Sequence, residues 1–467
     1  MPELPEVTNI IDYLKNHEKI LNKTINKVDV FYDYPIDGDI KTFKDEITNQ
    51  KILDITRKGK YIIFHLSNDL VIVSHLRMEG KFFVKNESVI KEKHDLVMFH
   101  FTDNTKLVYN DTRRFGRMIL SKESAYLKKT PLSKLGPEPL DDIKIDDIKD
   151  KIVTKNIGIK QLLLDQSIMS GIGNIYADEI CFACNLNPRT PGKFLDDNDL
   201  NNIIKYSKII LNNAILNGGS TIKTYHISED KIGSFQSKLK VYGREGKPCF
   251  NCGHIIRKIF INGRGTCFCP HCQKDKSLPF VLAISGPIAS GKSSINAYFV
   301  KHGFISIDLD EITHKVYKDK NMQNQLKELI PTLKIVDKDI DRVYLKSYLI
   351  EHHNIKNQLE DILYSYLYEH ILKQLRKIGK NNKVVMDVPL LFKSHLDDYA
   401  DKIMIVQIDK DKQEERLLKR NGETKSYLKI NESYYLQEDI KKADYLISNN
   451  SSLEDLYNQL DKIIKNI

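Results

Sequence analysis

The chain has 467 residues, of which 41% are hydrophobic and 29% are charged, and its formal net charge is +9. This length allows two to four domains, and the composition is that of an ordinary soluble protein. No apolar run is long enough to cross a membrane, and the N-terminus lacks a signal-peptide pattern, so no membrane partner is expected. The charge is modest and Lys, Asn and Ile are abundant, so charge alone is weak evidence for a nucleic-acid partner. The seven cysteines are too few for a secreted disulfide scaffold, and we expect a cytoplasmic protein.

The N-terminus, residues 1–7 (MPELPEV), carries a candidate nucleophile. Loss of the initiator Met would expose the secondary amine of Pro2. An α-amino group titrates near pH ~8, so much of it is neutral at physiological pH, and such amines attack electrophilic carbon to form Schiff bases. Glu3 would then lie within reach as an acid or base. The alternative is an ordinary helix N-terminus with Pro and acidic residues in its first turn.

Period-two alternation of apolar residues predicts an antiparallel β-sandwich domain over residues 1–135. Turn residues separate the alternating stretches, which are 60–66, 70–76, 96–101 and 106–109.

Two loops in this domain combine Arg with Met or Phe: residues 75–80 (HLRMEG) and 111–116 (DTRRFG). Guanidinium groups neutralise phosphates while apolar side chains can wedge into a base stack, so these loops suit contact with duplex DNA. For either loop alone, the alternative is a solvated hairpin whose Met or Phe belongs to the core.

A Pro-rich break at residues 135–140 (LGPEPL) predicts a domain boundary, and residues 136–240 are expected to form a helical DNA-binding domain. Within it, residues 159–166 and 171–179 (GIGNIYADE) predict a helix, a glycine turn and a second helix. Gly171 and Gly173 are expected to let backbone N–H groups approach a phosphate at the second helix N-terminus. A dinucleotide fingerprint fits less well, because no strand precedes the turn and the third Gly is missing.

Residues 241–273 are predicted to form a zinc ribbon. The C-x2-C-x16-C-x2-C spacing provides two thiolate pairs, enough for one closed, structural Zn²⁺ site; the ligands are Cys249, Cys252, Cys269 and Cys272. Between the pairs, residues 262–266 present Arg264 at the tip of a hairpin. Cys181 and Cys184 lack a second pair and are expected to pack on a helix face as small apolar residues.

A second nucleotide-binding signal follows the ribbon. The apolar run 280–284 predicts a buried strand, and residues 286–294 (GPIASGKSS) read as a P-loop. Backbone N–H groups of such a loop cradle phosphates, its Lys reaches the outer phosphates and its Ser can ligate magnesium. The predicted ATP-binding residues here are Gly286, Ser290, Gly291, Lys292, Ser293 and Ser294. Further strands at 304–307, 383–387 and 402–407 predict a P-loop α/β domain with a mainly parallel sheet over residues 279–467.

Charged residues at the ends of these elements are candidates for phosphoryl transfer. Asp308 and Asp310 follow the second strand of this domain, where a carboxylate could deprotonate an acceptor hydroxyl or hold magnesium. The alternative is that they cap a helix. Arg416 and Arg420 are spaced to close on the transferring phosphate.

The N-terminal heptapeptide, residues 57–61 (RKGKY) and the two Arg-containing loops together resemble bacterial formamidopyrimidine-DNA glycosylase, and residues 171–179 resemble its helix–two-turns–helix element. The resemblance implies a DNA glycosylase/AP lyase that excises oxidised purines, 8-oxoguanine and formamidopyrimidine, from damaged double-stranded DNA. It implies a Schiff base on Pro2 followed by β,δ-elimination, with Glu3 as proton donor and acceptor and Lys60 close to the same site.

The same resemblance implies roles for further residues. Glu179 should support the active site, Arg264 should bind phosphate at the lesion, and the loop that begins at residues 218–221 should close over the extruded base. The predicted DNA-binding residues are Met78, His94, Arg113, Arg114, Phe115, Lys155 and Asn174, of which Met78, Arg113 and Phe115 should wedge the duplex.

The order of motifs in the C-terminal part resembles dephospho-CoA kinase, which implies phosphorylation of dephospho-CoA by ATP with Mg²⁺. Three departures are present: Lys393 where the family usually has Glu, Tyr364-Ser365 where it has His-Pro, and Pro287 where it has Gly. Most lie on the acceptor side. The leading hypothesis is therefore a monomeric, bifunctional enzyme; one alternative is a repair glycosylase with a nucleotide-binding module that has lost kinase activity. A further alternative is a non-catalytic DNA-damage binder in the front half.

Overall fold

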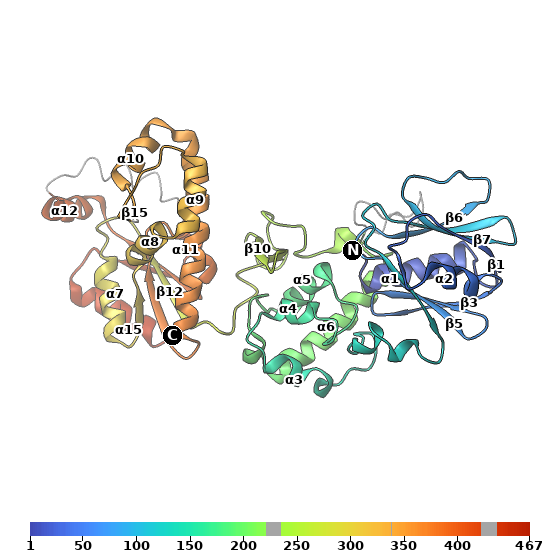
Figure 1. Cartoon of the computed structure of the whole chain (residues 1–467). Helices are drawn as coiled ribbons and strands as arrows, with labels where there is room; N and C mark the ends of the chain where they lie inside the picture. Colours follow the sequence, from blue (N-terminus) through green and yellow to red (C-terminus); the bar gives the residue numbers. More distant parts are fainter. Residues whose placement is uncertain (221–234, 338, 422–436) are drawn as a thin grey trace. The chain divides into compact units, whose positions relative to one another are not determined.

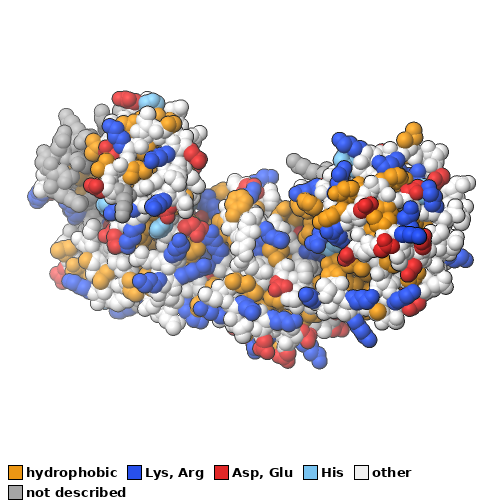
Figure 2. Space-filling view, in the orientation of Figure 1, with side chains coloured by type: hydrophobic (Ala, Val, Ile, Leu, Met, Phe, Trp, Pro, Cys, Tyr) orange, Lys and Arg blue, Asp and Glu red, His pale blue; other side chains and the backbone are white. Residues whose placement is uncertain are grey.

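The computed structural model describes residues 1–220, 235–337, 339–421 and 437–467. They form two compact units, Met1–Lys276 and Ser277–Ile467, whose elements are labelled in Figure 1. Among the described residues, no helix has the length and apolar character that a membrane span needs. Lys and Arg side chains are scattered with Asp and Glu over the face of each unit seen in Figure 2.

The first unit begins with helix α1 (Leu4–Asp12) and a β-sandwich. One sheet has the order β1-β7-β8-β6 and the other β2-β9-β5-β4-β3. The strands are β1 (Ile25–Val30), β2 (Ile36–Asp37), β3 (Ile52–Lys58), β4 (Tyr61–Leu66), β5 (Leu70–His75), β6 (Lys81–Asn86), β7 (Asp95–Phe101), β8 (Thr105–Asn110) and β9 (Arg117–Lys122). The sandwich is confirmed; it is antiparallel except for the short β2–β9 pair, which is parallel and departs from the prediction.

The sandwich core explains the alternating pattern. Alternate residues of β4 and β5, together with α1 and helix α2 (Ile40–Ile47), pack into one large apolar cluster between the sheets. Strand β5 is buried along its whole length, because Val71 and Val73 on its other face are covered by Leu132 from the following segment. A strand covered on both faces reads as a continuous apolar run.

The helical part of this unit surrounds a second core. Its helices are α3 (Lys149–Val153), α4 (Ile159–Leu164), α5 (Asn174–Ala183) and α6 (Asp197–Leu216), so the predicted helix, glycine turn and helix are confirmed. Leu4 of α1 belongs to this core, which fixes the chain's N-terminus against α5. The zinc ribbon contributes the hairpin β10 (Arg257–Ile261) and β11 (Arg264–Phe268), turned by Asn262 and Gly263, both at positive φ. Two positive φ values in a two-residue loop match the twist of the flanking strands.

The second unit is a parallel sheet of order β13-β16-β12-β17-β18, and every neighbouring pair is parallel. Its strands are β12 (Phe280–Ser285), β13 (Ile305–Ile307), β16 (Lys383–Asp387), β17 (Lys402–Gln407) and β18 (Tyr445–Ser448), with a small β14 (Ile335–Val336) and β15 (Asp339–Ile340) hairpin. The helices are α7 (Lys292–Lys301), α8 (Leu309–Tyr317), α9 (Lys320–Leu329), α10 (Arg342–Glu351), α11 (Lys356–Ile378), α12 (Lys410–Asn421), α14 (Gln437–Ile440) and α15 (Leu453–Ile464). Separate apolar clusters involve the two faces of the sheet, as in a doubly wound domain.

Candidate active sites

Glu3 lies at the N-terminus of α5, although 170 residues of sequence separate it from Gly173. Its carboxylate accepts hydrogen bonds from the backbone N–H groups of Gly173 at 2.7 Å and Ile175 at 2.9 Å. The side chain is 2% exposed. Burial raises the pKa of Glu3, while the nearby Lys60 ammonium lowers it. A carboxyl group with these opposing influences is suited to exchange protons.

The glycine turn before α5 serves this carboxylate and not an external phosphate. A Cβ on Gly173 would lie 2.2 Å from Glu3 Cδ. The N–H of Gly171 donates to Gln166 Oε1 at 2.9 Å. The prediction that these two N–H groups approach a phosphate is therefore wrong, because both are already donated within the protein. The anion at this helix N-terminus is Glu3 itself.

Lys60 lies beside the same site, as predicted from the resemblance. It lies in the turn between β3 and β4 and donates from Nζ to the Ile172 carbonyl at 2.7 Å. Burial lowers the pKa of Lys60, the Glu3 carboxylate raises it, and the Arg264 guanidinium lowers it. The turn is fixed by Glu138, which pairs with Arg57 at 2.7 Å and accepts the Gly59 N–H at 2.7 Å.

The N-terminal amino group lies in the same surroundings. Burial lowers the pKa of the Met1 amine, whereas Glu3 and Glu6 raise it. Glu6 accepts the Glu3 N–H at 3.0 Å and the Tyr176 hydroxyl at 2.6 Å. Pro2 is buried, so removal of Met1 would place its amine within this group of carboxylates.

Arg264 is exposed at the start of β11, and its charge reaches Lys60. Residues that follow it are anchored on the helical domain. Lys160 Nζ donates to the Gly265 carbonyl at 3.1 Å and pairs with Asp178 at 2.7 Å, and both side chains are fully buried. Asp178 in turn accepts the Cys267 N–H at 2.9 Å. This buried pair fixes the hairpin that carries Arg264, a function that the sequence pattern did not reveal.

Glu179 positions the chain that enters the ribbon. Its carboxylate accepts the N–H groups of Lys240, Val241 and Tyr242 at 2.8, 2.9 and 2.9 Å. Burial raises the pKa of Glu179, and these backbone hydrogen bonds lower it. These three hydrogen bonds connect α5 to the segment that enters the ribbon.

The two Arg-containing loops of the sandwich meet. Arg113 Nη1 lies 3.1 Å from Met78 Sδ, and its guanidinium lies 5.1 Å from the Phe115 ring centroid. Met78 and Phe115 are 44% and 47% exposed. We call Met78, Arg113 and Phe115 the wedge cluster. Since both apolar side chains are exposed, the alternative that they belong to the core is wrong.

Asp111 gives the wedge cluster its rigid base. It is fully buried and accepts the N–H groups of Arg113, Phe115 and Gly116 at 3.0, 2.9 and 2.9 Å. The buried Tyr109 hydroxyl lies beneath both loops, where a Cβ on Gly116 would approach it to 1.6 Å and one on Gly80 to 2.5 Å. A side chain at Gly80 or at Gly116 would collide with Tyr109, which explains why each loop has a glycine there.

The remaining predicted DNA-binding residues range from exposed to half-buried. Arg114 stacks on Tyr32 with 4.7 Å between guanidinium and ring, and Lys155 is exposed between α3 and α4. Asn174 donates to the Gly265 carbonyl at 3.1 Å. The His94 carbonyl accepts the Asp111 N–H at 3.0 Å. The loop predicted to close over a base, from Thr221 onward, lies outside the described residues.

The four predicted zinc ligands converge. Their sulfur atoms all lie within 4.8 Å of one another, with Cys249 to Cys272 at 3.9 Å and Cys252 to Cys269 at 3.5 Å. A tetrahedral Zn²⁺ with bonds of about 2.3 Å needs sulfur pairs about 3.8 Å apart, so the cluster fits one zinc ion with no open position. Cys181 is buried in the helical core and Cys184 packs against it, as expected of small apolar residues.

The P-loop joins β12 to α7. Gly286, Ala289 and Gly291 have positive φ, which turns the loop back over the helix N-terminus. Lys292 Nζ donates to the carbonyls of Gly286 and Pro287 at 2.8 and 2.9 Å. A hollow of about 540 Å³ opens here; it is lined by Ile288, Ala289, Gly291, Lys292, Ser293, Ser294, Asp387, Arg416, Asn449, Ser451 and Leu453.

Asn449, directly after the edge strand β18, and Arg416 of α12 hold this loop in place. Asn449 Nδ2 donates to the Ser290 carbonyl at 2.7 Å, and a Cβ on Gly291 would lie 2.2 Å from it. Arg416 donates to the carbonyls of Asn449 at 3.1 Å and Ala289 at 3.4 Å. The Arg420 side chain lies outside the described part of the structure.

Among the acidic residues, Asp308 acts as a cap. Its Oδ1 accepts the N–H groups of Asp310 and Glu311 at 2.9 and 3.1 Å, which is the capping alternative. Sequence reasoning missed Asp387, at the end of β16. Burial raises the pKa of Asp387, the Lys292 ammonium lowers it and the Asp310 carboxylate raises it, and Asp387 and Lys292 both line the hollow at the P-loop. Its position at a strand end beside the P-loop strand was the available signal.

The comparisons with known proteins cover both units. Family models match in chain order: the formamidopyrimidine-DNA glycosylase N-terminal domain at residues 1–118, its H2TH domain at 135–226, the zinc finger found in FPG and IleRS at 246–274, and dephospho-CoA kinase at 280–455.

Curated relatives and solved structures match the first unit. Formamidopyrimidine-DNA glycosylases of Listeria innocua serovar 6a and Ligilactobacillus salivarius are each 42% identical, over 279 and 282 residues; each match covers 59% of this chain and 100% of the relative. A crystal structure of the Lactococcus lactis enzyme, a mutant in complex with Fapy-dG-containing DNA, has a TM-score of 0.56 and 35% identity. MutM in complex with carbocyclic 8-oxo-G-containing DNA has a TM-score of 0.55 and 34% identity. Each structure match covers 58% of this chain and 100% of the other. The chain therefore belongs to the formamidopyrimidine-DNA glycosylase family, and it carries a dephospho-CoA kinase domain after the glycosylase part.

Proposed function

We propose that the first unit excises oxidised purines from duplex DNA and then cleaves the strand, with Pro2 as nucleophile. The observation that carries the proposal is the meeting of the N-terminus, Glu3 and Lys60 at the start of α5. The Pro2 amine attacks the sugar C1′, the base leaves, and a Schiff base forms. Glu3 exchanges protons with the sugar, and the Lys60 ammonium stabilises the negative charge of the Glu3 carboxylate. Loss of acidified sugar protons then breaks the strand by β,δ-elimination.

DNA is held around this centre by residues from three domains. The wedge cluster fills the space left by an extruded nucleotide, which costs a few kcal/mol of unstacking. Arg264 neutralises the phosphate at the lesion, and its ribbon hairpin is fixed by Zn²⁺ and by the buried Lys160–Asp178 pair. Asn174, Lys155, His94 and Arg114 contact the DNA backbone. The structures in complex with Fapy-dG and 8-oxo-G DNA support these lesions as substrates.

Borohydride trapping on an 8-oxoguanine duplex tests the chemistry, because only a Schiff-base enzyme becomes covalently attached. Wild-type protein should be trapped, whereas Pro2→Gly should lose most or all of the trapped species. Pro5→Ala is the matched control, since Pro5 lies in the same helix start but has no free amine. Equal trapping of the Pro2→Gly and wild-type proteins would exclude the mechanism, and binding without trapping would indicate a damage binder.

We propose that the second unit phosphorylates dephospho-CoA with ATP and Mg²⁺. The dephospho-CoA kinase match and the braced P-loop support it. Gly286, Ser290, Gly291 and Ser294 line the phosphate cradle, Lys292 reaches the outer phosphates, and Ser293 ligates magnesium. Asp310 and Asp387 are the acidic groups placed to hold magnesium or deprotonate the acceptor hydroxyl, while Arg416 and Arg420 close on the phosphate.

The departure at Lys393 has a compensating partner. Lys393 Nζ lies 2.9 Å from Glu360 of α11, so the positive charge is paired within the acceptor side of the domain. A coupled assay with ATP and dephospho-CoA tests activity: CoA should form, and Lys292→Met should lower the rate by about 10²-fold or more. ATP binding without CoA formation would favour the nucleotide-binding alternative.

We also retain the division into domains 1–135, 136–240, 241–273 and 279–467. One unit supplies all the described residues of each candidate site, so neither proposed activity needs a second copy of the chain, and we keep the monomer as a proposal. We also propose a cytoplasmic location, because a chain with seven cysteines, four of them in a zinc site, does not resemble a secreted disulfide scaffold.

A further inference from the structure

Three aromatic side chains lie exposed in a row directly after β1. Phe31, Tyr32 and Tyr34 are 47%, 36% and 47% exposed. Their backbone is fixed, because Phe31 N–H donates to the Leu96 carbonyl at 2.9 Å and Ile36 N–H to the Asp33 carbonyl at 3.0 Å. The row is therefore a fixed part of the sandwich edge, and neither of the proposed activities uses these three aromatic side chains.

Each ring has a cation over it. Lys91 lies 4.8 Å from Phe31, Arg114 lies 4.7 Å from Tyr32, and Arg117 lies 3.4 Å from Tyr34. Arg117 also donates from Nη1 to the Tyr34 carbonyl. We call Tyr32, Tyr34, Arg114 and Arg117 the aromatic strip. Cation–π contacts of this kind fix the rings while leaving guanidinium N–H groups able to bind an anion.

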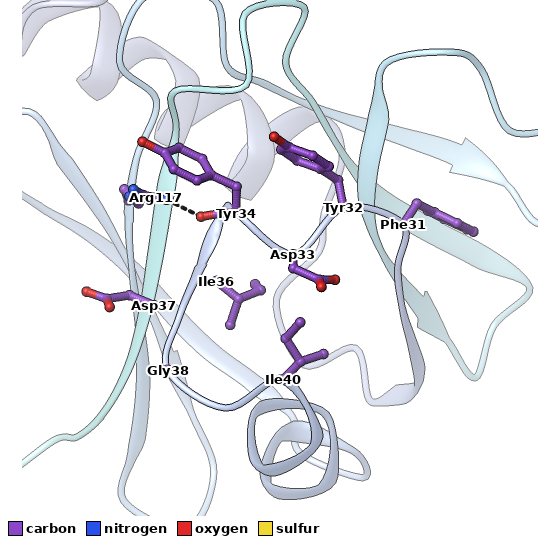
Figure 3. A pocket seen from close by; sticks show the side chains of 9 residues that line it. All are labelled: Phe31, Tyr32, Asp33, Tyr34, Ile36, Asp37, Gly38, Ile40 and Arg117. Atoms are coloured by element: carbon purple, nitrogen blue, oxygen red, sulfur yellow. Dashed lines mark hydrogen bonds between the residues drawn. The ribbon is translucent and has the colours of Figure 1, made fainter.

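A hollow of about 800 Å³ lies against the strip. Figure 3 shows Tyr32 and Tyr34 along one rim, with Asp33, Ile36 and Ile40 below them. The apolar side chains give a surface on which a planar ring can rest, and the Asp33 carboxylate can accept hydrogen bonds from an amine. Asp33 and Asp37 both line the hollow and repel phosphate, so the hollow suits a nucleobase, whereas Arg117, which also lines it, suits the DNA backbone.

The aromatic strip is continuous with the wedge cluster. Arg114 lies between Arg113 and Phe115 in sequence, in the loop held by Asp111. Positive φ at Arg114 (59°) lets neighbouring side chains of this short loop point in different directions. Arg113 accordingly stacks on Phe115, whereas Arg114 stacks on Tyr32. The strip thus begins where the predicted duplex wedge ends.

Alternating aromatic faces and guanidinium groups are the chemistry that holds single-stranded nucleic acid. We propose that the aromatic strip binds an unpaired nucleotide of the DNA next to the lesion. Its base stacks on Tyr32 or Tyr34 with an exocyclic amine near Asp33, and its phosphate contacts Arg114 or Arg117. This proposal rests on the proposed DNA glycosylase function, and it adds a class of substrate: lesions beside a gap or an unpaired stretch.

Fluorescence anisotropy of the full chain tests the strip. Three probes carry the same tetrahydrofuran lesion analogue. One is a fully paired duplex, and two, which we call the gapped probes, have a two-nucleotide unpaired stretch on one side or the other of the lesion. Wild-type protein should bind one of the gapped probes more tightly than the paired probe. The double variant Tyr32→Leu/Tyr34→Leu should lose that preference, by about fivefold or more per stacked base. Tyr32→Phe/Tyr34→Phe should keep it, because the ring faces remain.

Controls separate this site from the glycosylase centre. Tyr206→Leu removes another tyrosine that has a cation over its ring, since Lys205 Nζ lies 5.5 Å from the ring centroid. This variant should bind the paired and the gapped probes as tightly as the wild type. Trapping on a paired 8-oxoguanine duplex should be the same for wild type and the Leu variant. If wild type is not trapped, the glycosylase proposal fails, and the strip is then judged by binding of a short single-stranded oligonucleotide. Two results would overturn the aromatic strip proposal. One is that the Leu variant keeps the wild-type preference for the gapped probe, and the other is that it loses the same amount of affinity for the paired and the gapped probes.

Discussion

At the residue scale, the Glu3 site shows how one side chain explains several sequence features. Its carboxylate needs two α5 N–H groups and a neighbour without a Cβ, which Gly173 provides. The glycine pattern before α5 was visible in the sequence, but its partner was not. Only the packing of Leu4 into the helical core brings residue 3 to that helix.

Gly173→Ala therefore tests the Glu3 geometry. The added methyl group would lie 2.2 Å from Glu3 Cδ, so the carboxylate must leave the helix N-terminus. We expect trapping to fall by about 10²-fold, with DNA binding largely retained. Gly246→Ala is the control for a glycine replacement without a clash: a Cβ there meets nothing within 4 Å, although Gly246 has a φ of 76° and Gly173 one of −126°. Wild-type trapping by Gly173→Ala would show that the position of Glu3 is not needed.

His75 gives a second prediction at this scale. Its Nδ1 accepts the Arg77 N–H at 3.0 Å, and burial lowers the pKa of His75 from 6.5 to about 3. Between these values the unfolded segment binds a proton that the folded one excludes. Its contribution to stability is complete above about pH 6.5 and is lost as the pH falls toward 3. At pH 5 the free energy of local opening should be about 2 kcal/mol lower than at pH 7.5.

Hydrogen exchange of peptides covering residues 70–80, corrected for intrinsic rates, measures this opening. Protection should fall about 30-fold between pH 7.5 and pH 5 in the wild type. His75→Gln should lack most of this dependence, since its amide does not titrate. The same pH dependence in both proteins would mean that another group controls the loop.

At the element scale, period-two alternation found four strands of the sandwich, β4, β5, β7 and β8, but not β1, β3 or β6, which contribute to the same core. It was less informative for β2 and β9, a parallel pair of which one member has two residues. The P-loop strand, β16 and β17 were predicted closely because continuous apolar runs mark buried parallel strands. Strand β18 was missed as a strand, although its end supplies Asn449.

The bracing of the P-loop by the end of β18 can be tested with Asn449→Ala. The change leaves the buried Ser290 carbonyl without the donor that lies at 2.7 Å, at a cost of about 1–3 kcal/mol. We expect the Kd for ATP to rise by about 5- to 100-fold in a titration with a fluorescent ATP analogue. Asn450→Ala is the control, because Asn450 accepts the Asp409 N–H at 2.8 Å outside the loop. An unchanged Kd for Asn449→Ala would mean that the loop holds its shape unaided.

At the scale of the whole molecule, the sequence motifs placed the junction close to where the structure divides. The ribbon ends and the P-loop strand begins within a few residues, and the two units separate at Lys276 and Ser277. Motif spacing could predict this because each motif belongs to one core. It could not predict how the wedge cluster forms, because Arg113 contacts both Met78 and Phe115 in a loop that the buried Asp111 holds in place.

The separate cores predict that the two activities can be lost one at a time. Zinc binding supplies much of the folding free energy of small metal domains. Cys252→Ser, or chelation, should therefore unfold the ribbon hairpin, release Gly265 from Lys160 and remove Arg264 from the site. Trapping on an 8-oxoguanine duplex should be lost together with one equivalent of zinc, whereas CoA formation by the same preparation should be unchanged.

Cys184→Ala is the control for this experiment, because Cys184 is a partly buried cysteine outside the zinc cluster. It should keep the metal and both activities. A parallel loss of CoA formation in Cys252→Ser would show that the kinase unit depends on the ribbon for its fold or its activity. Zinc loss with normal trapping would instead show that the hairpin is held by the Lys160–Asp178 pair alone. The Lys160–Asp178 pair binds Gly265 and Cys267 of β11, and the zinc ligand Cys269 follows that strand directly, so the metal and the buried ion pair are expected to stabilise the same strand.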